Sequence, residues 1–288
     1  MKIAITGYNG FVGQYLRNYF ASKGLEIIPI ERKLLYGDLH ALTSLIEESN
    51  IVIHLAGATL NKYWTKKYMQ KIYNSRILTT NQLVKAISLC KNRPQVLIST
   101  SAIGIYDNKH SHDENSRYLA GTFLGKVCKD WELAALNAEN FGVDVYILRF
   151  GIVLGLNGGM IKKMLPLFKI GLGGSIGNGN QALSFIHIDD LVRIYDAIIS
   201  GQLKKGIYNA VSPYPTTNKQ FSKQMAHILK RPLFFAIPKF VFRILFGKGA
   251  ELLTQGQLVY PHSLLEQGFK FKYETIDSAL HAILKPQK

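Results

Sequence analysis

The chain has 288 residues, of which 47% are hydrophobic, enough for one large domain or two closely joined ones. Only two cysteines are present, which excludes a disulfide framework and fits a cytoplasmic protein. No apolar run approaches the roughly 18 residues of a membrane span, and we expect neither a span nor a signal peptide in the first ten residues.

The formal net charge of +16 is unevenly distributed, because residues 197–250 contain nine Lys or Arg and no Asp or Glu. Such a segment suits a solvated basic surface, an anionic small ligand, a nucleic acid or an acidic membrane face. No nucleic-acid motif accompanies the bases, so we expect a small anionic substrate and no nucleic-acid partner. The stretch PKFVFRILFGK (238–248) leaves peripheral membrane attachment open, since aromatics alternate there with Lys and Arg.

In chain order, apolar strands alternate with helical stripes through the first half of the sequence. Strands are predicted at residues 2–6, 26–31, 51–55, 95–100 and 143–150, and helices at 11–23, 40–48, 67–90 and 122–140. The strands are nearly continuous in apolar residues, which is typical of a sheet buried on both faces. The pattern therefore predicts an α/β fold with a doubly wound parallel sheet.

The first predicted strand runs into ITGYNGFVG, with glycines at three-residue intervals before a helix. A helix N-terminus offers unpaired N–H groups and about half a positive charge, which suits a pyrophosphate. Gly7 would allow the tight turn, Gly10 the close approach of the phosphates, and Gly13 the close packing of helix on strand. With Phe11 and Val12 at the start of the helix, the turn predicts a dinucleotide-binding site.

The end of the second strand should select the cofactor. An acid there binds the ribose 2′-hydroxyl of NAD, whereas an arginine nearby favours the 2′-phosphate of NADP. Glu31 is followed by Arg32 and Lys33, so the sequence favours NADP and leaves NAD possible. We expect Asp38 and Leu39 to contact the adenine end.

Two later strand ends should complete the cofactor site. The backbone at Ala56 and Gly57, after the third strand, should border the ribose and the nicotinamide. Ser99, in the fourth strand, is a further cofactor-binding candidate. Because a dinucleotide lies outside the carboxyl ends of parallel strands, these residues should meet at one edge of the sheet.

The second half of the chain differs in composition and in the pattern of its predicted elements. Glycine-rich turns follow residue 155, then a predicted strand at 184–188, a helix capped by Asp189, and a strand at 206–210. From residue 213 the chain is rich in helix-forming, aromatic and basic residues. We predict an NAD(P)-binding Rossmann domain over 1–158, to which residues near 184–210 return, and a smaller C-terminal substrate lobe over 159–288.

Several motifs resemble the extended short-chain dehydrogenase/reductases: TGYNGFVG, HLAGA (54–58), STSAIGIYD (99–107) and LRFGIVLG (148–155). Others are similar to those of the atypical, YfcH-type epimerase family: SRILTT (75–80), FLGKVCKDWE (123–132), SFIHIDDL (184–191) and GQLVYP (256–261). The resemblance spans nearly the whole chain. It implies a Rossmann domain with a substrate lobe, and it leaves a homodimer possible.

The resemblance implies a catalytic serine, a tyrosine that transfers the proton, and a lysine four residues after it. Ser101 matches the serine, but Leu124 and Cys128 stand where the tyrosine and the lysine belong. The usual proton transfer is therefore in doubt. Tyr106, five residues past Ser101, and Glu114, expected in the loop above the cofactor, are the alternative acid/base candidates.

Four residues are candidates for binding the substrate. Arg76 replaces an asparagine of the extended family, and an arginine facing the cleft would suit a carboxylate or a phosphate. The resemblance places Arg149 and Asn209 in the cleft between the lobes, and His187 precedes two acids at the start of a helix. We expect no metal.

Two functions stay open from the sequence. The first is an NAD(P)-dependent oxidoreductase or epimerase-like enzyme for an oxygenated substrate, for example a nucleotide sugar. The second is an NADP(H)-binding sensor or regulatory module that has lost catalysis. Cofactor-dependent turnover that requires Ser101 would distinguish them.

Overall fold

The computed structural model describes residues 1–285, and its centre is a six-stranded sheet in the order β11-β6-β4-β3-β1-β2. Its strands are β1 (Lys2–Thr6), β2 (Glu26–Ile30), β3 (Ile51–His54), β4 (Val96–Ala102), β6 (Asp144–Phe150) and β11 (Gly206–Ala210). Every neighbouring pair is parallel. The predicted doubly wound parallel sheet is confirmed.

The strand order reverses beside β1. The chain passes from β1 outward to β2 and then crosses to β3 on the other side of β1. In open α/β sheets, ligands bind outside the carboxyl ends of the strands at such a reversal. The register pairs Thr6 with His54, so the last residues of β1 and β3 lie side by side at this point.

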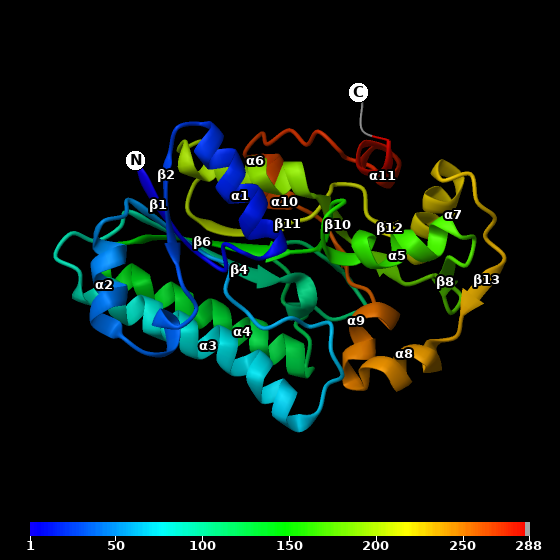
Figure 1. Ribbon diagram of the computed structural model, residues 1–288, viewed down its shortest axis with the longest axis horizontal. Helices are drawn as coiled ribbons and strands as arrows, with labels where there is room; N and C mark the ends of the chain where they lie inside the picture. Colours follow the sequence, from blue (N-terminus) through cyan, green and yellow to red (C-terminus); the bar gives the residue numbers. More distant parts are fainter. Residues whose placement is uncertain (286–288) are drawn as a thin grey trace.

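Helices cover both faces of the sheet (Figure 1). One face carries α2 (Leu39–Glu47), α3 (Lys66–Leu89) and α4 (Phe123–Leu136), and the other carries α1 (Phe11–Ser22) and α6 (Ile188–Ile199). Alternate residues of β1 contribute to two cores: Ile3 and Ile5 pack with α1 and α6, whereas Ala4 packs with the opposite layer. Burial on both faces explains the continuous apolar strands.

A second lobe extends from the carboxyl edge of the sheet, on the right of Figure 1. Its core is built on α5 (Gly159–Lys169), α7 (Asn218–Ile228) and α11 (Ile276–Leu284), with Phe168, Phe221 and Leu280 inside it. The second half of the chain also contains three short strand pairs. They are β7 (Ile152–Leu154) with β10 (Phe185–His187), β9 (Ala182–Leu183) with β12 (Thr216–Thr217), and β8 (Gly174–Ile176) with β13 (Phe235–Ile237).

The segment between α7 and α11 passes between the two lobes. It includes α8 (Lys239–Phe246), α9 (Glu251–Thr254), β14 (Leu258–Val259), paired with β5 (Ser111–His112), and α10 (His262–Glu266) beside β11. Single 3₁₀ turns are η1 (Leu34–Tyr36), η2 (Ile103–Ile105), η3 (Asn137–Phe141) and η4 (Lys248–Ala250). Across residues 1–285, no helix has both the length and the apolar character needed to span a bilayer.

One predicted helix cap is wrong. The helix α6 begins at Ile188, and its cap is His187 instead of Asp189. The Nδ1 atom of His187 accepts the Asp189 N–H at 3.1 Å, so an unprotonated ring nitrogen replaces the expected carboxylate. The predicted helix over 122–140 also ends earlier, at Leu136, where it continues as η3.

Candidate functional site

The glycine turn between β1 and α1 is tightly packed backbone. Gly7 has a positive φ of 69°, and a Cβ atom there would lie 3.0 Å from the carbonyl group of Leu55. A Cβ atom on Gly13 would lie 2.4 Å from the carbonyl oxygen of Gly7. The two glycines therefore let β1, the loop after β3 and α1 approach closely at the reversal of the sheet.

The helix α1 starts without a side-chain cap. Its N-cap is Gly10, which provides no side-chain hydrogen bond, and its first turn contains no acid. The first helical hydrogen bond runs from the Gln14 N–H to the Gly10 carbonyl at 3.0 Å. The backbone N–H groups of Phe11, Val12 and Gly13 are thus of the kind that a phosphate satisfies at a helix N-terminus.

Phe11 links the glycine turn to the second lobe. A Cβ atom on Gly158, the residue before α5, would lie 2.2 Å from the Phe11 ring. The ring also meets Tyr15 edge to face, with centroids 5.5 Å apart. The start of α1 and the start of α5 are therefore held together by one aromatic contact.

His54, at the end of β3, is neutral, and its tautomer follows from its neighbours. Its Nδ1 lies 2.8 Å from Thr6 Oγ1 and its Nε2 lies 2.9 Å from Thr80 Oγ1. Thr80 Oγ1 already donates to the carbonyl oxygen of Arg76 at 2.6 Å, so Nε2 must donate and Nδ1 must accept. Burial lowers the pKa of His54 to about 3.

Thr6 also positions the loop after β3. Thr6 Oγ1 accepts the N–H groups of Leu55 at 3.0 Å and Ala56 at 3.2 Å. Together with the contact between Leu55 and Gly7, these bonds fix the backbone at Ala56 and Gly57 beside the glycine turn. The structure therefore brings these predicted cofactor residues together at the reversal of the sheet.

Ser99 lies next to His54 in the sheet register. Its side chain is buried, and its Oγ atom has no hydrogen-bond partner among residues 1–285. Buried hydroxyls are nearly always hydrogen-bonded in folded proteins. An orphaned hydroxyl here is what a site for a polar ligand would leave, and it fits a dinucleotide.

The charges after β2 are arranged to expose an arginine. Lys33 pairs with Glu31 at 2.8 Å and so neutralises the acid that could bind a ribose 2′-hydroxyl. The Arg32 guanidinium lies over the Tyr36 ring, 5.6 Å from its centroid. Within the described part of the chain Arg32 has no carboxylate partner, which leaves its charge available for a 2′-phosphate.

Asp38 and Leu39 connect η1 to α2. Asp38 Oδ1 accepts the Ala41 N–H at 2.9 Å and caps α2. Leu39 is the first residue of the helix and packs against the core beneath it. A contact of these two residues with an adenine stays a prediction.

Arg76 places a positive charge beside the loop after β3. A Cβ atom on Gly57 would lie 3.1 Å from Cζ of the Arg76 guanidinium, and the guanidinium stacks over the Trp131 ring, 5.1 Å from its centroid. It donates to the Ala58 carbonyl at 3.3 Å, and no carboxylate among residues 1–285 pairs with it. Burial lowers the pKa of Arg76, which is the direction expected for a cation without a partner.

Ser101, Glu132 and Arg149 form a buried cluster. Glu132 accepts hydrogen bonds from Ser101 Oγ at 2.6 Å and from Arg149 Nε and Nη2 at 2.8 and 2.7 Å. Burial opposes the charged form of Arg149, but its contacts with Glu132 prevail and raise the pKa of Arg149. The Ser101 proton is committed to Glu132, so the Ser101 oxygen is free only to accept.

The cluster continues through Tyr106. Arg149 Nη1 donates to Tyr106 Oη at 2.7 Å, and that hydroxyl donates to Asn209 Oδ1 at 2.9 Å. Glu114 then accepts the backbone N–H groups of Asn209 at 2.8 Å and Ser263 at 3.2 Å. Burial raises the pKa of Tyr106. Burial also raises the pKa of Glu114, although the two N–H groups that it accepts act in the opposite direction. Five predicted residues therefore belong to one interior network.

The helix α4 carries no acid/base pair at the expected positions. Leu124 packs beside Gly104, and the Cys128 thiol is buried. Burial raises the pKa of Cys128 to about 12, so the thiol stays protonated at neutral pH. Glu132, four residues further on, shares this face of the helix. Sequence reasoning missed its role, although its spacing from Cys128 places it on the buried stripe.

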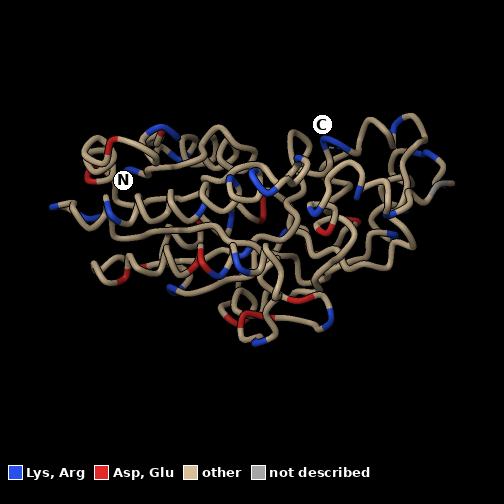
Figure 2. The backbone as a smooth tube through the Cα atoms, turned by 90° about the horizontal axis from the view of Figure 1, so that it is seen from below, with Lys and Arg blue, Asp and Glu red and all other residues tan. Residues whose placement is uncertain are grey.

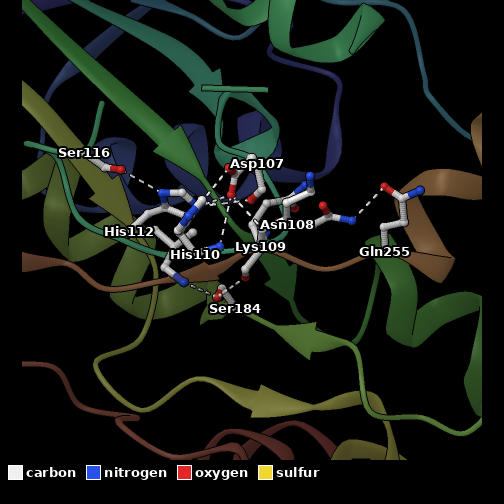
Figure 3. A network of polar contacts seen from close by, with 10 residues as sticks. Asp107, Asn108, Lys109, His110, His112, Ser116, Ser184 and Gln255 are labelled. Carbon is white, nitrogen blue, oxygen red and sulfur yellow. Dashed lines mark hydrogen bonds and ion pairs between the residues drawn. The ribbon is translucent and has the colours of Figure 1, made fainter. Parts of the chain in front are cut away.

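The loop after Tyr106 is folded by a second network, shown in Figure 3. Asp107 Oδ1 accepts the N–H groups of Lys109 and His110 at 2.9 and 3.1 Å. His112 lies with Nε2 3.2 Å from the same oxygen and accepts a hydrogen bond from Ser116 at Nδ1, 2.8 Å away. The ring of His112 also stacks on the Tyr106 ring, with centroids 4.7 Å apart, so the loop packs against the tyrosine.

His187 has a structural position. Besides capping α6, its ring lies 3.9 Å from the Tyr273 ring, and the side chain is almost fully buried. Burial lowers the pKa of His187, so the neutral imidazole that accepts the Asp189 N–H is favoured. Among residues 1–285, no hydrogen bond or ion pair joins this residue to the Ser101 cluster.

A parallel sheet with a glycine turn and an uncapped helix at its reversal defines a dinucleotide-binding protein of the Rossmann class. The NAD dependent epimerase/dehydratase family matches residues 3–210, and a domain of unknown function (DUF1731) matches residues 237–283. The chain belongs to the NAD dependent epimerase/dehydratase family. The identification made from the motifs is thus confirmed.

Relatives of this family cover the whole chain. The chloroplastic SDR39U1 homolog of Arabidopsis thaliana is 33% identical, over 99% of this chain and 87% of its own length. The epimerase family protein YfhF of Bacillus subtilis is 30% identical, over 100% and 99%. The crystal structure of human epimerase family protein SDR39U1 with NADPH has a TM-score of 0.90 and 28% identity, covering both chains fully.

Proposed function

We propose that the protein binds NADP(H) at the glycine turn and is an oxidoreductase or epimerase for a small, anionic, oxygenated substrate such as a nucleotide sugar. The observation that carries the proposal is the uncapped N-terminus of α1 at the reversal of the sheet. The NADPH in the similar human protein supports it.

The residues present fit this cofactor. The N–H groups of residues 11–13 would hold the diphosphate, and Arg32 would pair with the 2′-phosphate. The fixed backbone at Gly57 and the orphaned Ser99 hydroxyl lie where the ribose and nicotinamide half would lie. NADPH, when bound, supplies a hydride from its nicotinamide ring.

The chain's own contribution to chemistry is positioning. Glu132 holds the Ser101 proton, so Ser101 would accept a hydrogen bond from a substrate hydroxyl and orient it. Arg149 is engaged by Glu132 and Tyr106 and keeps both groups in place. Arg76, the positive charge beside Gly57, would attract an anionic group of the substrate.

Cofactor choice tests the first half of the proposal. We expect Arg32→Ala to weaken NADPH binding by about 10- to 100-fold and to leave NADH binding nearly unchanged, because one charge-assisted contact is lost. Arg231→Ala, at an exposed arginine three residues past the end of α7, is the matched control. Fluorescence titration with both nucleotides measures the ratio, and equal losses for the two would contradict the assignment of Arg32.

Turnover tests the second half against the alternative of a cofactor sensor, which we do not favour. NADPH oxidation is followed with a panel of carbonyl compounds and nucleotide sugars, using wild type, Ser101→Ala and, as control, Ser88→Ala, at a half-buried serine of α3. The proposal predicts turnover that falls in Ser101→Ala alone. NADPH binding without any Ser101-dependent turnover would support the sensor instead.

A further inference from the structure

The helix α8 exposes large apolar side chains. The exposed fractions are 61% for Phe240, 69% for Ile244 and 57% for Leu245. Phe240 and Ile244 are four residues apart and so lie one above the other on the same face of the helix. A helix on the surface of a globular protein normally turns such residues inward, so this outer face needs an explanation.

The helix is anchored to the dinucleotide-binding domain. The carbonyl oxygen of Phe246, at its end, accepts the Trp64 N–H at 3.1 Å, and Trp64 forms a parallel bridge with Gly247. Trp64 is buried and meets Phe123 edge to face at 5.9 Å. Figure 1 shows α8 beside the start of α3 for this reason. The exposed face therefore belongs to a fixed element and not to a loose tail.

Tyr63 extends the apolar surface. Its side chain is 54% exposed, and its ring lies 3.0 Å from where a Cβ atom on Gly247 would be. We call the surface formed by Tyr63, Phe240, Ile244 and Leu245 the α8 surface. It combines two segments that are far apart in the sequence.

The two segments that form the α8 surface are rich in positive charge. Residues 51–106 contain eight Lys or Arg, residues 197–250 contain nine, and neither segment contains an Asp or Glu. Exposed cations close to its residues in the chain are Lys62 and Lys66, which flank Tyr63, and Lys239, Arg243 and Lys248, in and just after α8. The first acid after them is Glu251, which is exposed at the start of α9, a helix that contacts α8. Figure 2 shows Lys and Arg predominating at the end of the molecule formed by the second lobe.

We propose that the α8 surface docks the protein on bilayers that contain anionic lipids. Exposed aromatic and aliphatic side chains flanked by Lys and Arg match a membrane interface, where the apolar groups enter the headgroup boundary and the cations face lipid charge. A nucleic acid would use the cations and could stack on Tyr63 and Phe240, but it would leave Ile244 and Leu245 without a role. The inference is independent of the proposed enzymatic function.

The test is co-sedimentation of the full chain with vesicles of phosphatidylcholine alone or with about one third phosphatidylglycerol. We expect binding only to the anionic vesicles, and binding that weakens at high salt. The partition coefficient of the variant Phe240→Ser/Ile244→Ser/Leu245→Ser should fall by at least about tenfold, because the apolar side chains that would enter the bilayer are removed. The variant Lys239→Gln/Arg243→Gln/Lys248→Gln should lose about fivefold per charge removed.

The matched control variant removes exposed leucines from α3 and α4, away from the α8 surface. Leu78, Leu89 and Leu133 are 49%, 57% and 54% exposed on α3 and α4, and their triple replacement by Ser should leave vesicle binding unchanged. Circular dichroism and thermal denaturation verify folding of every variant, and Ile244→Ser alone replaces the triple variant if that one fails to fold.

Three outcomes would overturn the proposal. One is absence of binding to anionic vesicles, and another is binding that the control triple reduces as much as the α8 triple. The third is competition by single-stranded DNA together with full vesicle binding by the apolar variant, which would make the surface a nucleic-acid site.

Discussion

Glu132 shows, at the scale of single residues, how the candidate site is held. It accepts hydrogen bonds from Ser101 and Arg149, which are 31 and 17 residues away in the chain. The sequence predicted Ser101 and Arg149 as site residues but not the carboxylate that joins them. Local patterns cannot supply such a partner, because the pairing depends on how α4 packs over β4 and β6.

Replacing Glu132 should unfold the site. We expect Glu132→Gln to lower the free energy of unfolding by about 3–5 kcal/mol, because the Arg149 charge would stay buried without its counter-charge. Asp130→Asn, two residues away on the same helix, removes the charge of a more exposed carboxylate that pairs with Lys126 and accepts the Tyr73 hydroxyl, and an amide oxygen can still accept that hydroxyl, so it should cost about 1 kcal/mol or less. Urea denaturation measures the free energy of unfolding of both variants. Equal losses would contradict the larger contribution expected of the buried pair of Glu132 and Arg149.

His54 should make stability depend on pH. Its pKa is about 3 in the fold against an ordinary 6.5, so the unfolded chain binds the extra proton between these values. Stability contributed by the neutral ring is complete above pH 6.5 and falls by about 1.4 kcal/mol per pH unit below it.

The comparison with a variant isolates this contribution. Urea denaturation at pH 7 and at pH 5 should show a steep loss for wild type and a shallower one for His54→Gln, which cannot take up the proton. The same slope in both proteins would contradict the buried neutral histidine.

At the scale of elements, periodicity predicted the large units and missed the small ones. The strands at 2–6 and 206–210 are found with the predicted bounds, and α3 differs by one residue at each end. The pairs β8–β13 and β9–β12 were not predicted, because strands of two or three residues carry no periodic pattern. The order of the sheet also depends on contacts between distant segments, so the reversal beside β1 came only from the structure.

The contact between α1 and β1 can be tested at Gly13. A Cβ atom there would lie 2.4 Å from Gly7 O and 2.7 Å from Tyr8 Cα, both of them backbone atoms. We expect Gly13→Ala to destabilise the protein by about 1–3 kcal/mol, although alanine is otherwise the better helix former.

Gly121 provides the control for this variant. A Cβ atom there would meet nothing within 4 Å, so Gly121→Ala should change stability by about 0.5 kcal/mol or less. Thermal denaturation compares the two. A Gly13→Ala protein that is more stable than wild type would show that close packing is not the reason for this glycine.

At the scale of the whole molecule, the two lobes meet around the reversal of the sheet. Phe11 packs against Gly158 at the start of the second lobe, while β11 brings Asn209 from the second half of the chain into the main sheet. The cofactor turn could be predicted because its residues are consecutive. The interior network could not, since its members come from β4, α4, β6, β11 and the loops between them.

The most direct test of the account is NADPH titration of Gly10→Leu beside wild type. Gly10 has an extended backbone with φ −71° and ψ 170°, which any residue can adopt. A Cβ atom there would lie 3.1 Å from the Gly7 carbonyl oxygen, a tight contact that a small backbone shift relieves, so the fold should survive. The leucine side chain would obstruct the phosphates at the start of α1, and we expect affinity to fall by about a hundredfold with only a small drop in melting temperature. Unchanged NADPH affinity in a folded Gly10→Leu protein would contradict dinucleotide binding at the glycine turn.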